Sequence, residues 1–285
     1  MAPDRVAPIL VIKLGALGDL AQAFGAFAAI RAGHPGQRIV LLTTAPYVEV
    51  MRASPWFDEV WSEARVPVWR LSAWLGLRRR ILDAGFARVY DLQTSERTDW
   101  IFRMLGPGRR PEWVGRVAGA SHRHTDPCRD RLHGIERLAG QLAVAGIAMD
   151  MAPDLSWARA DIRGFGLPRR VAMLVPGASP HRPAKRWPVE GFAALAARLA
   201  TRGLGVAVLG TAAEAPLGAA IAAAAPGTID LCGRTSLGDL LPLGRVASLA
   251  IGNDTGPMHW LAAMGTPCLT LFSAASDPAR CAPHG

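Results

Sequence analysis

Residues 9–19 read ILVIKLGALGD, and this stretch decides the fold class. It opens with an apolar run around a single lysine, which is typical of a central parallel strand buried on both faces. A tight turn follows, and a helix is predicted from about residue 19 to residue 32, where GHPG at 33–36 ends it. Residues 38–44 predict a second strand. Strand, helix and strand at this spacing form a βαβ unit with a right-handed crossover.

The same alternation continues along the chain and restarts after a linker-like region at 148–170. Before the linker, strands are predicted at 59–61 and 89–92, with a helix at 71–84. After it, we predict strands at 171–175, 206–209, 229–231, 248–251 and 268–272. The predicted helices between them span 189–202, 216–225, 237–243 and 258–264. We therefore expect an α/β protein with two doubly wound domains, residues 1–155 and 168–285.

Composition excludes several classes of protein. The chain has 285 residues, a net charge of +9, 50% hydrophobic residues and only 19% charged residues, so long disorder is not expected. No apolar run reaches about 18 residues and no signal-peptide pattern is present, which predicts a cytoplasmic protein. The four cysteines are widely spaced and predict neither disulfides nor zinc. His122, His124 and Cys128 lack a fourth ligand and are expected in an exposed loop, so no metal site is predicted.

Rare residues gather at three loops. Lys13 and Lys185 are the only lysines, so 30 of the 32 basic residues are arginine, and Asn253 is the only asparagine. All three lie in or beside residues 15–19, 176–187 and 252–259, which follow predicted strands. Ligands of open α/β sheets bind beyond the carboxyl ends of strands, so these loops are candidate sites.

The first loop does not fit a nicotinamide cofactor. Its glycines, Gly15 and Gly18, are spaced GxxG rather than GxGxxG, and the second strand ends in Thr43-Thr44 without an acidic residue for a ribose. No GxxxxGK[ST] phosphate loop is present either. Asp19, at the start of the predicted helix, has an alternative role as a helix cap.

The other two loops suit a phosphorylated ligand, although each residue also has a simpler interpretation. Lys185 would hold a diphosphate, or belong to a solvated basic loop. Free N–H groups at Thr255 and Gly256 would bind a phosphate at a helix N-terminus. Asp254 would cap that helix or accept hydrogen bonds from sugar hydroxyls, and His259 is a ligand contact or a packed core residue.

Three motifs together resemble glycosyltransferase family 9, the ADP-heptose:lipopolysaccharide heptosyltransferases. They are residues 12–19 (IKLGALGD), 185–188 (KRWP) and 253–259 (NDTGPMH), in the family's order and over nearly the whole chain. The resemblance implies a GT-B fold, with two Rossmann-like domains facing a cleft. It also implies metal-independent, inverting transfer of heptose from ADP-heptose to the lipopolysaccharide inner core, with no cofactor besides the nucleotide-sugar donor.

The resemblance assigns roles to individual residues. Asp19 is similar to the general base, in the acceptor domain, and Lys185 to the residue that stabilises the leaving diphosphate. Gly15 and Gly18 form the acceptor-side turn. Glu214 would bind the ribose, Thr235 would pack on adenine, and Asp254 would contact the sugar. The implied donor-binding residues are Ser179, Glu214, Thr235, Asp254, Thr255, Gly256 and His259.

Two departures from the family pattern leave alternatives open. Residues 273–276 read SAAS where the family commonly has a Gly-Pro-Thr-like run, and the chain stops at Gly285, so we expect a second domain short at its C-terminal end. One alternative is a family-9-like transferase that uses another nucleotide sugar. The other is a non-catalytic protein that binds a sugar nucleotide or lipopolysaccharide.

The first domain has the composition of an acceptor-binding surface. Six of the nine tryptophans lie between residues 56 and 113, and residues 52–137 hold 16 arginines against 11 acidic residues. Arginine pairs with carboxylates and phosphates, and tryptophan with arginine suits a membrane interface. These features predict an anionic lipopolysaccharide acceptor and peripheral contact with the cytoplasmic face of the inner membrane. Several tryptophans are alternatively core residues. No nucleic-acid-binding motif accompanies the charge, so no nucleic-acid partner is predicted.

Overall fold

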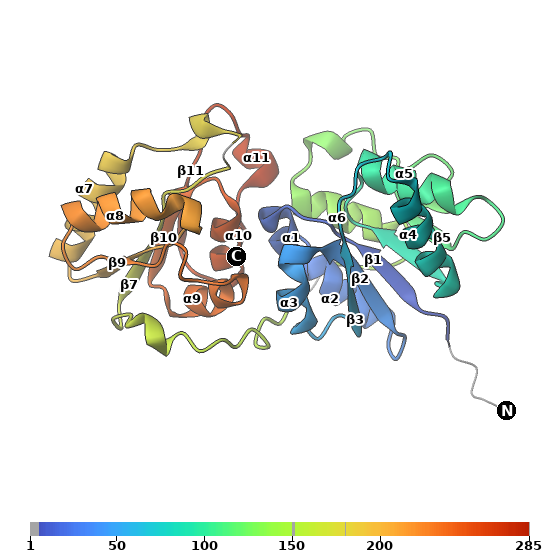
Figure 1. The fold of residues 1–285 in the computed structure, drawn as a ribbon, viewed down its shortest axis with the longest axis horizontal. Coiled ribbons are helices and arrows are strands. Elements are labelled where there is room, and N and C mark those ends of the chain that lie inside the picture. The colour runs from blue at the N-terminus through green and yellow to red at the C-terminus, as the bar shows by residue number, and fades with distance from the viewer. Residues whose placement is uncertain (1–5, 150–151, 180, 285) are drawn as a thin grey trace. The chain divides into compact units, whose positions relative to one another are not determined.

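The computed structural model describes residues 6–149, 152–179 and 181–284 (Figure 1). Residues 150 and 151 of the predicted linker, residue 180 of the second loop, and residue 285 lie outside this part. Contacts between Cα atoms divide the chain into two compact units. Unit 1 comprises Met1–Gly15 and Ala23–Asp154, and unit 2 comprises Ala16–Gln22 and Leu155–Gly285.

Unit 1 is built on a parallel sheet of strand order β3-β2-β1-β4-β5-β6. The strand order reverses between β1 and β4, the point where ligands of doubly wound sheets bind. Every residue of β1 and β2 is buried, which explains their unbroken apolar sequences. The strands are β1 Ile9–Ile12, β2 Ile39–Thr44, β3 Glu59–Glu63, β4 Arg88–Asp91, β5 Glu112–Gly115 and β6 His122–Arg123.

Helices flank this sheet (Figure 1). Most tryptophans of unit 1 are buried between them and the sheet. Four of the six tryptophans in the 56–113 stretch are core residues, as in the simpler interpretation, whereas Trp69 and Trp100 are exposed. A capping box between Ser95 and Thr98 begins α5. The helices of unit 1 are α2 Phe24–Gly33, α3 Ala45–Arg52, α4 Leu71–Asp83, α5 Glu96–Leu105 and α6 Gly134–Ala143.

Unit 2 repeats the same winding, with a parallel sheet of order β11-β10-β7-β8-β9. Every strand and helix predicted between residues 171 and 272 is present, with ends shifted by a few residues. The strands are β7 Val171–Val175, β8 Gly205–Val208, β9 Ile229–Asp230, β10 Leu249–Asn253 and β11 Cys268–Leu271. The helices are α7 Val189–Thr201, α8 Ala215–Ala224, α9 Leu240–Val246, α10 Gly256–Ala263 and α11 Pro278–Cys281.

The predicted single helix at 19–32 is wrong, because two helices occupy that region. Helix α1 (Leu17–Gln22) ends at Gln22, and Ala23 is the N-cap residue of α2. The break separates the two units, since residues 16–22 make their contacts with unit 2. There α1 packs on α10, where Trp260 Nε1 donates a hydrogen bond to the Leu17 carbonyl (2.9 Å). Asp19, expected in the first domain, therefore groups with the second unit.

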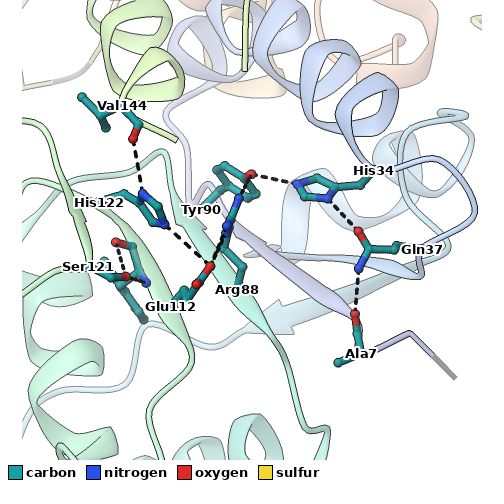
Figure 2. Close-up of polar contacts among 10 residues, drawn as sticks. Ala7, His34, Gln37, Arg88, Tyr90, Glu112, Ser121, His122 and Val144 are labelled. Atoms are coloured by element: carbon teal, nitrogen blue, oxygen red, sulfur yellow. Dashed lines mark hydrogen bonds and ion pairs between the residues drawn. The ribbon is translucent and has the colours of Figure 1, made fainter. Parts of the chain in front are cut away.

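A polar network lies at the amino-terminal ends of the unit 1 strands, opposite the ligand-binding edge (Figure 2). The Tyr90 hydroxyl contacts His34 Nε2 (2.8 Å) and accepts a hydrogen bond from Arg88, and Arg88 also pairs with Glu112. Burial lowers the pKa of His34 and raises that of Tyr90. His122 lies on β6 beside Glu112 and His124 is buried, so the expected exposed loop is wrong for both histidines, whereas Cys128 is exposed. This network links β4, β5 and β6 to the C-terminal end of α2, at the sheet edge opposite the one where ligands bind.

No helix in the described part of the chain is long and apolar enough to cross a bilayer. No group of three or more His, Cys, Asp or Glu side chains among the residues described could hold a metal ion.

Candidate active site

The second and third loops both leave the carboxyl edge of the unit 2 sheet. β7 and β10 are hydrogen-bonded neighbours, so the chain segments that follow Val175 and Asn253 begin side by side. Because ligands of parallel sheets bind at this edge, the loops form the candidate site.

Lys185 and Asp254 form an ion pair in this site. Lys185 Nζ donates to Asp254 Oδ2, and the two side chains are only 12% and 6% exposed. Lys185 ends a short 3₁₀ turn, and Asp254 directly follows β10. The loop around Lys185 is exposed, as in the solvated-loop interpretation, but the Lys185 side chain itself is not solvated. A buried charge must be paired to remain charged. Asp254 therefore holds the Lys185 ammonium group in its charged form at the strand edge.

Asn253 connects the two loops, a role that the sequence did not assign to it. Its side chain is fully buried; Oδ1 accepts from the Trp187 N–H (3.0 Å), and Nδ2 donates to the Pro176 carbonyl (2.7 Å). A buried amide with both ends satisfied holds its neighbours in one arrangement. Its signal in the sequence was only its rarity and its place before Asp254.

The third loop ends at the N-terminus of α10. Thr255 is the N-cap residue, its side chain makes no capping hydrogen bond, and Pro257 lies in the first turn. Asp254 therefore does not cap the helix, and its predicted contact with a sugar stays a prediction. The first backbone N–H groups of an α-helix have no partner within the helix and carry the positive end of its dipole. Thr255 and Gly256 present such groups beside the ion pair, as phosphate binding requires.

Helix α1 places Asp19 near α10. A Cβ on Gly256 would lie 2.6 Å from Leu17 Cβ, and one on Gly18 would lie 2.8 Å from His259 Cδ2, so the two helices meet through glycines. The His259 ring is buried in this contact, as expected of a packed histidine. Asp19 is exposed, and its Oδ2 accepts a hydrogen bond from the Ala16 N–H (3.0 Å). Asp19 thus caps its own turn while its carboxylate faces solvent.

Glu214 lies against the loop that follows β7. Its Oε2 accepts hydrogen bonds from the Thr211 N–H (2.7 Å) and hydroxyl (3.0 Å), which fixes the carboxylate. A Cβ on Gly177 would be 1.6 Å from Glu214 Oε1, so a side chain at this position would displace the Glu214 carboxylate. The structure therefore brings Glu214 together with the second loop, near the exposed Ser179.

Thr235 lies at the same edge but farther along the sheet. It follows β9, which β8 separates from β7. Gly233, with a left-handed φ of 72°, packs against the Ala212 backbone and donates its N–H to the Gly210 carbonyl (2.9 Å). Thr235 is partly buried beside this crossing. The structure therefore places Thr235 apart from Lys185 and Asp254 along this edge.

The carboxyl edge of unit 1 contains polar residues that the sequence analysis missed. Asp91, at the end of β4, accepts hydrogen bonds from the Gln93 and Thr94 N–H groups (3.2 and 2.9 Å), and Gln93 Oε1 accepts from the Leu14 N–H (2.9 Å). Burial raises the pKa of Asp91 to about 6. The signal in the sequence was a polar run directly after a buried strand.

Gly15, the first glycine of the acceptor-side turn, follows β1 at the same carboxyl edge of the unit 1 sheet. Its φ of 113° is one that residues with a side chain rarely adopt, and a Cβ would lie 2.7 Å from Tyr47 Cε2. The turn therefore requires glycine at this position.

Comparisons with known proteins show the family of this chain. Residues 74–285 match the family described as Glycosyltransferase family 9 (heptosyltransferase). Lipooligosaccharide heptosyltransferase 2 of Haemophilus influenzae is 35% identical over 113 residues, 38% of this chain and 32% of that protein's length. Lipopolysaccharide heptosyltransferase 2 of Escherichia coli is 26% identical over 294 residues, 94% of this chain and 83% of that protein.

A solved structure supports the fold. The glycosyl transferase family 9 protein of Veillonella parvula superposes with a TM-score of 0.83 at 22% identity, over 97% of this chain and 83% of that one. The expected α/β fold with two Rossmann-like parallel sheets, of GT-B type, is confirmed.

Proposed function

Since this chain belongs to glycosyltransferase family 9, the heptosyltransferase family, we propose that it transfers heptose from ADP-heptose to the lipopolysaccharide inner core. The observation that carries the proposal is the buried Lys185–Asp254 pair next to the N-terminus of α10. An ammonium group and a helix N-terminus at one strand edge form a site for a diphosphate, the leaving group of a nucleotide sugar.

In this proposal unit 2 binds the donor. Lys185 and the Thr255 and Gly256 N–H groups would hold the diphosphate, with Ser179 nearby. Asp254, already positioned by Lys185, would accept hydrogen bonds from the sugar hydroxyls. Glu214 would accept from the ribose, and its fixed carboxylate next to Gly177 supports that role.

The remaining donor contacts follow from the same placement. Thr235 would pack on adenine, at the far end of the strand edge from the sugar. His259 would act from α10, where its ring meets Gly18.

The proposed reaction is a direct displacement with inversion. Asp19 would take the proton from an acceptor hydroxyl as that oxygen forms a bond to the anomeric carbon. The bond from this carbon to the diphosphate oxygen breaks, and ADP leaves with the electron pair. Lys185 and α10 would stabilise the negative charge that develops on ADP, so this mechanism needs no metal.

The proposed acceptor is the anionic inner core of lipopolysaccharide, with unit 1 and the Gly15–Gly18 turn on its side. The excess of arginine over acidic residues between 52 and 137 supports an anionic partner. Such an acceptor is anchored in a membrane, and we therefore place the enzyme in the cytoplasm at the inner membrane face.

The test measures ADP release from ADP-heptose with a deacylated inner-core acceptor. Turnover is expected with ADP-heptose, whereas a faster rate with another nucleotide sugar would reassign the donor. Donor binding without turnover of any sugar would instead indicate a binding protein.

Variants then test the roles of the two charged residues. Asp19→Ala should abolish turnover and keep ADP binding, and Lys185→Met should weaken both. Asp161→Ala is the matched control for Asp19, because it too is exposed and accepts a backbone hydrogen bond, from the Arg163 N–H (3.0 Å). Equal turnover in the Asp19 and Asp161 variants would show that Asp19 caps its turn and does not act as the base.

A further inference from the structure

Unit 1 exposes a group of large apolar side chains that the donor site does not use. Val68, Trp69, Leu71 and Leu75, here called the 68–75 patch, are each more than half exposed, and Trp69 is 77% exposed. Four such residues within eight positions differ from the isolated exposed apolar residues found on most surfaces.

A rigid turn presents the first two of these side chains. The Arg70 N–H donates to the Pro67 carbonyl (3.1 Å), so Val68 and Trp69 are the two central residues of a hydrogen-bonded turn. These positions usually hold Gly, Asn, Asp or Ser, and apolar residues there point away from the core.

The base of the turn is held from below by α4 and α5. Trp74 Nε1 donates to the Pro67 carbonyl (3.3 Å), and Arg97 donates to the Val66 carbonyl (3.0 Å) while its guanidinium lies over the Trp74 ring. Buried Trp74 therefore supports an exposed turn, and the protruding residues are not a disordered loop.

The patch continues onto α4 and its neighbour α5 (Figure 1). Leu71 and Leu75 are separated by one helical turn and share the outer face of α4. Arg97 stacks on Trp74, and Arg78 donates to the Met104 carbonyl (2.7 Å), so the exposed Trp100 lies between these two contacts along α5. The apolar surface of the turn thus continues onto the outer face of α4, and Trp100 is a further exposed aromatic residue on α5.

Arginine outnumbers acidic residues around the patch, although Glu96 and Asp99 lie near Trp100 on α5. Residues 64–82 contain five arginines and no acidic residue, and Asp83, which follows, pairs with Arg79 (3.3 Å). Arg70 lies inside the patch and is exposed, as is Arg103 on α5. Two copies of so positive a surface would repel each other, whereas a negatively charged surface would attract it.

From these observations we propose that the 68–75 patch docks unit 1 on an anionic phospholipid bilayer. Trp69 and the leucines would enter the headgroup region, where tryptophan is favoured, and the surrounding arginines would meet lipid phosphates. The inference rests on the proposed function only for its purpose, which is to hold the enzyme near a membrane-anchored acceptor.

The direct test is co-sedimentation of the whole protein with vesicles of phosphatidylcholine, with and without phosphatidylglycerol. Binding should require phosphatidylglycerol and weaken with added salt. Trp69→Ser combined with Leu75→Ser should abolish binding, and Arg70→Ala should weaken it about fivefold, as expected for one arginine near an anionic surface. Leu269→Ser and Arg202→Ala, exposed residues of unit 2, are the matched controls and should bind like the wild type.

Other outcomes would overturn the proposal. These are no binding by the wild type, unchanged binding by the serine double variant, or a dimer that this variant dissociates in sedimentation equilibrium. Thermal melting of each variant verifies folding. A separate readout compares turnover of a deacylated acceptor with that of an acceptor in vesicles. The serine double variant should lose turnover of the acceptor in vesicles and keep turnover of the deacylated acceptor. Vesicle binding without any turnover would refute the proposed function and leave the docking proposal standing.

Discussion

Replacing Gly18 with alanine tests whether the contact between α1 and α10 keeps Asp19 in place. Gly18 lies inside α1, one residue before Asp19, and its missing side chain lets the His259 ring pack directly on the helix backbone. An alanine Cβ would lie 2.8 Å from His259 Cδ2 and 3.1 Å from Nε2. The two helices or the ring must therefore move apart.

The size of this effect follows from the distances. Ordinary contact begins at 3.4 Å, so the separation must grow by about 0.6 Å. Forcing an extra methyl group into a packed contact costs about 1–3 kcal/mol. Alanine is a better helix former than glycine, which stabilises the folded state by up to about 1 kcal/mol. We expect a net loss of about 0–3 kcal/mol in unfolding free energy.

Activity should fall by more than stability. A displacement of about 1 Å in a catalytic group can cost about a hundredfold in rate, so kcat for ADP release should fall at least about tenfold. The assay pairs steady-state turnover of ADP-heptose and a deacylated acceptor with urea unfolding and calorimetric ADP binding. We expect the Kd for ADP to change less than kcat.

Gly76→Ala is the matched control. Gly76 also lies within a helix, α4, but a Cβ there would meet nothing within 4 Å. This variant should gain about 0.5–1 kcal/mol and keep its kcat. If Gly18→Ala gains stability and retains kcat in the same way, the α1–α10 contact does not position Asp19.

Three further perturbations test the site and its supports. Lys185→Met should lower the free energy of unfolding in urea by about 3–5 kcal/mol, because it leaves the Asp254 carboxylate buried without its partner. Adding Asp254→Asn should recover most of this loss. Additive effects of the two substitutions would contradict a coupled pair. Burial raises the pKa of Asp91 to about 6. Between about pH 4 and 6 the folded protein therefore binds more protons than the unfolded chain. As the pH rises through that range, the contribution of Asp91 to the unfolding free energy should fall by about 3 kcal/mol. Asp91→Asn should flatten the pH profile, and an unchanged profile would mean that Asp91 titrates normally. Asn253→Asp keeps the acceptor for the Trp187 N–H but loses the donor to Pro176, so the Kd for ADP should rise; an unchanged Kd would show that the two loops hold their places without it.

The sequence predicted the elements of unit 2 better than those of unit 1. Strands such as β7 are apolar runs bounded by glycine or proline, and helices such as α7 have clear apolar periodicity, so local patterns suffice. In unit 1 the helices α3, α5 and α6 and the strands β5 and β6 were not predicted. β6 has only two residues, and its pairing with β5 exists only once the sheet has formed.

Asp19 shows a limit of reasoning from chain order. Its position after β1 suggested that it would stay with the first sheet. In the structure α1 groups with unit 2, because contacts of Leu17 and Gly18 with α10 outweigh connection to β1. A contact between residues some 240 positions apart, such as Trp260 to Leu17, has no local signature in a sequence.

The sequence by itself determined the two α/β halves, the strand ends where ligands bind, and the residue types placed there. These follow from apolar runs, glycine turns and helix starts, which act over a few residues. Tertiary structure alone decided which partners those residues have: Lys185 with Asp254, Glu214 against Gly177, and α1 on α10. It also decided which tryptophans are core residues and that Trp69 protrudes, because burial depends on packing between distant segments that no local pattern encodes.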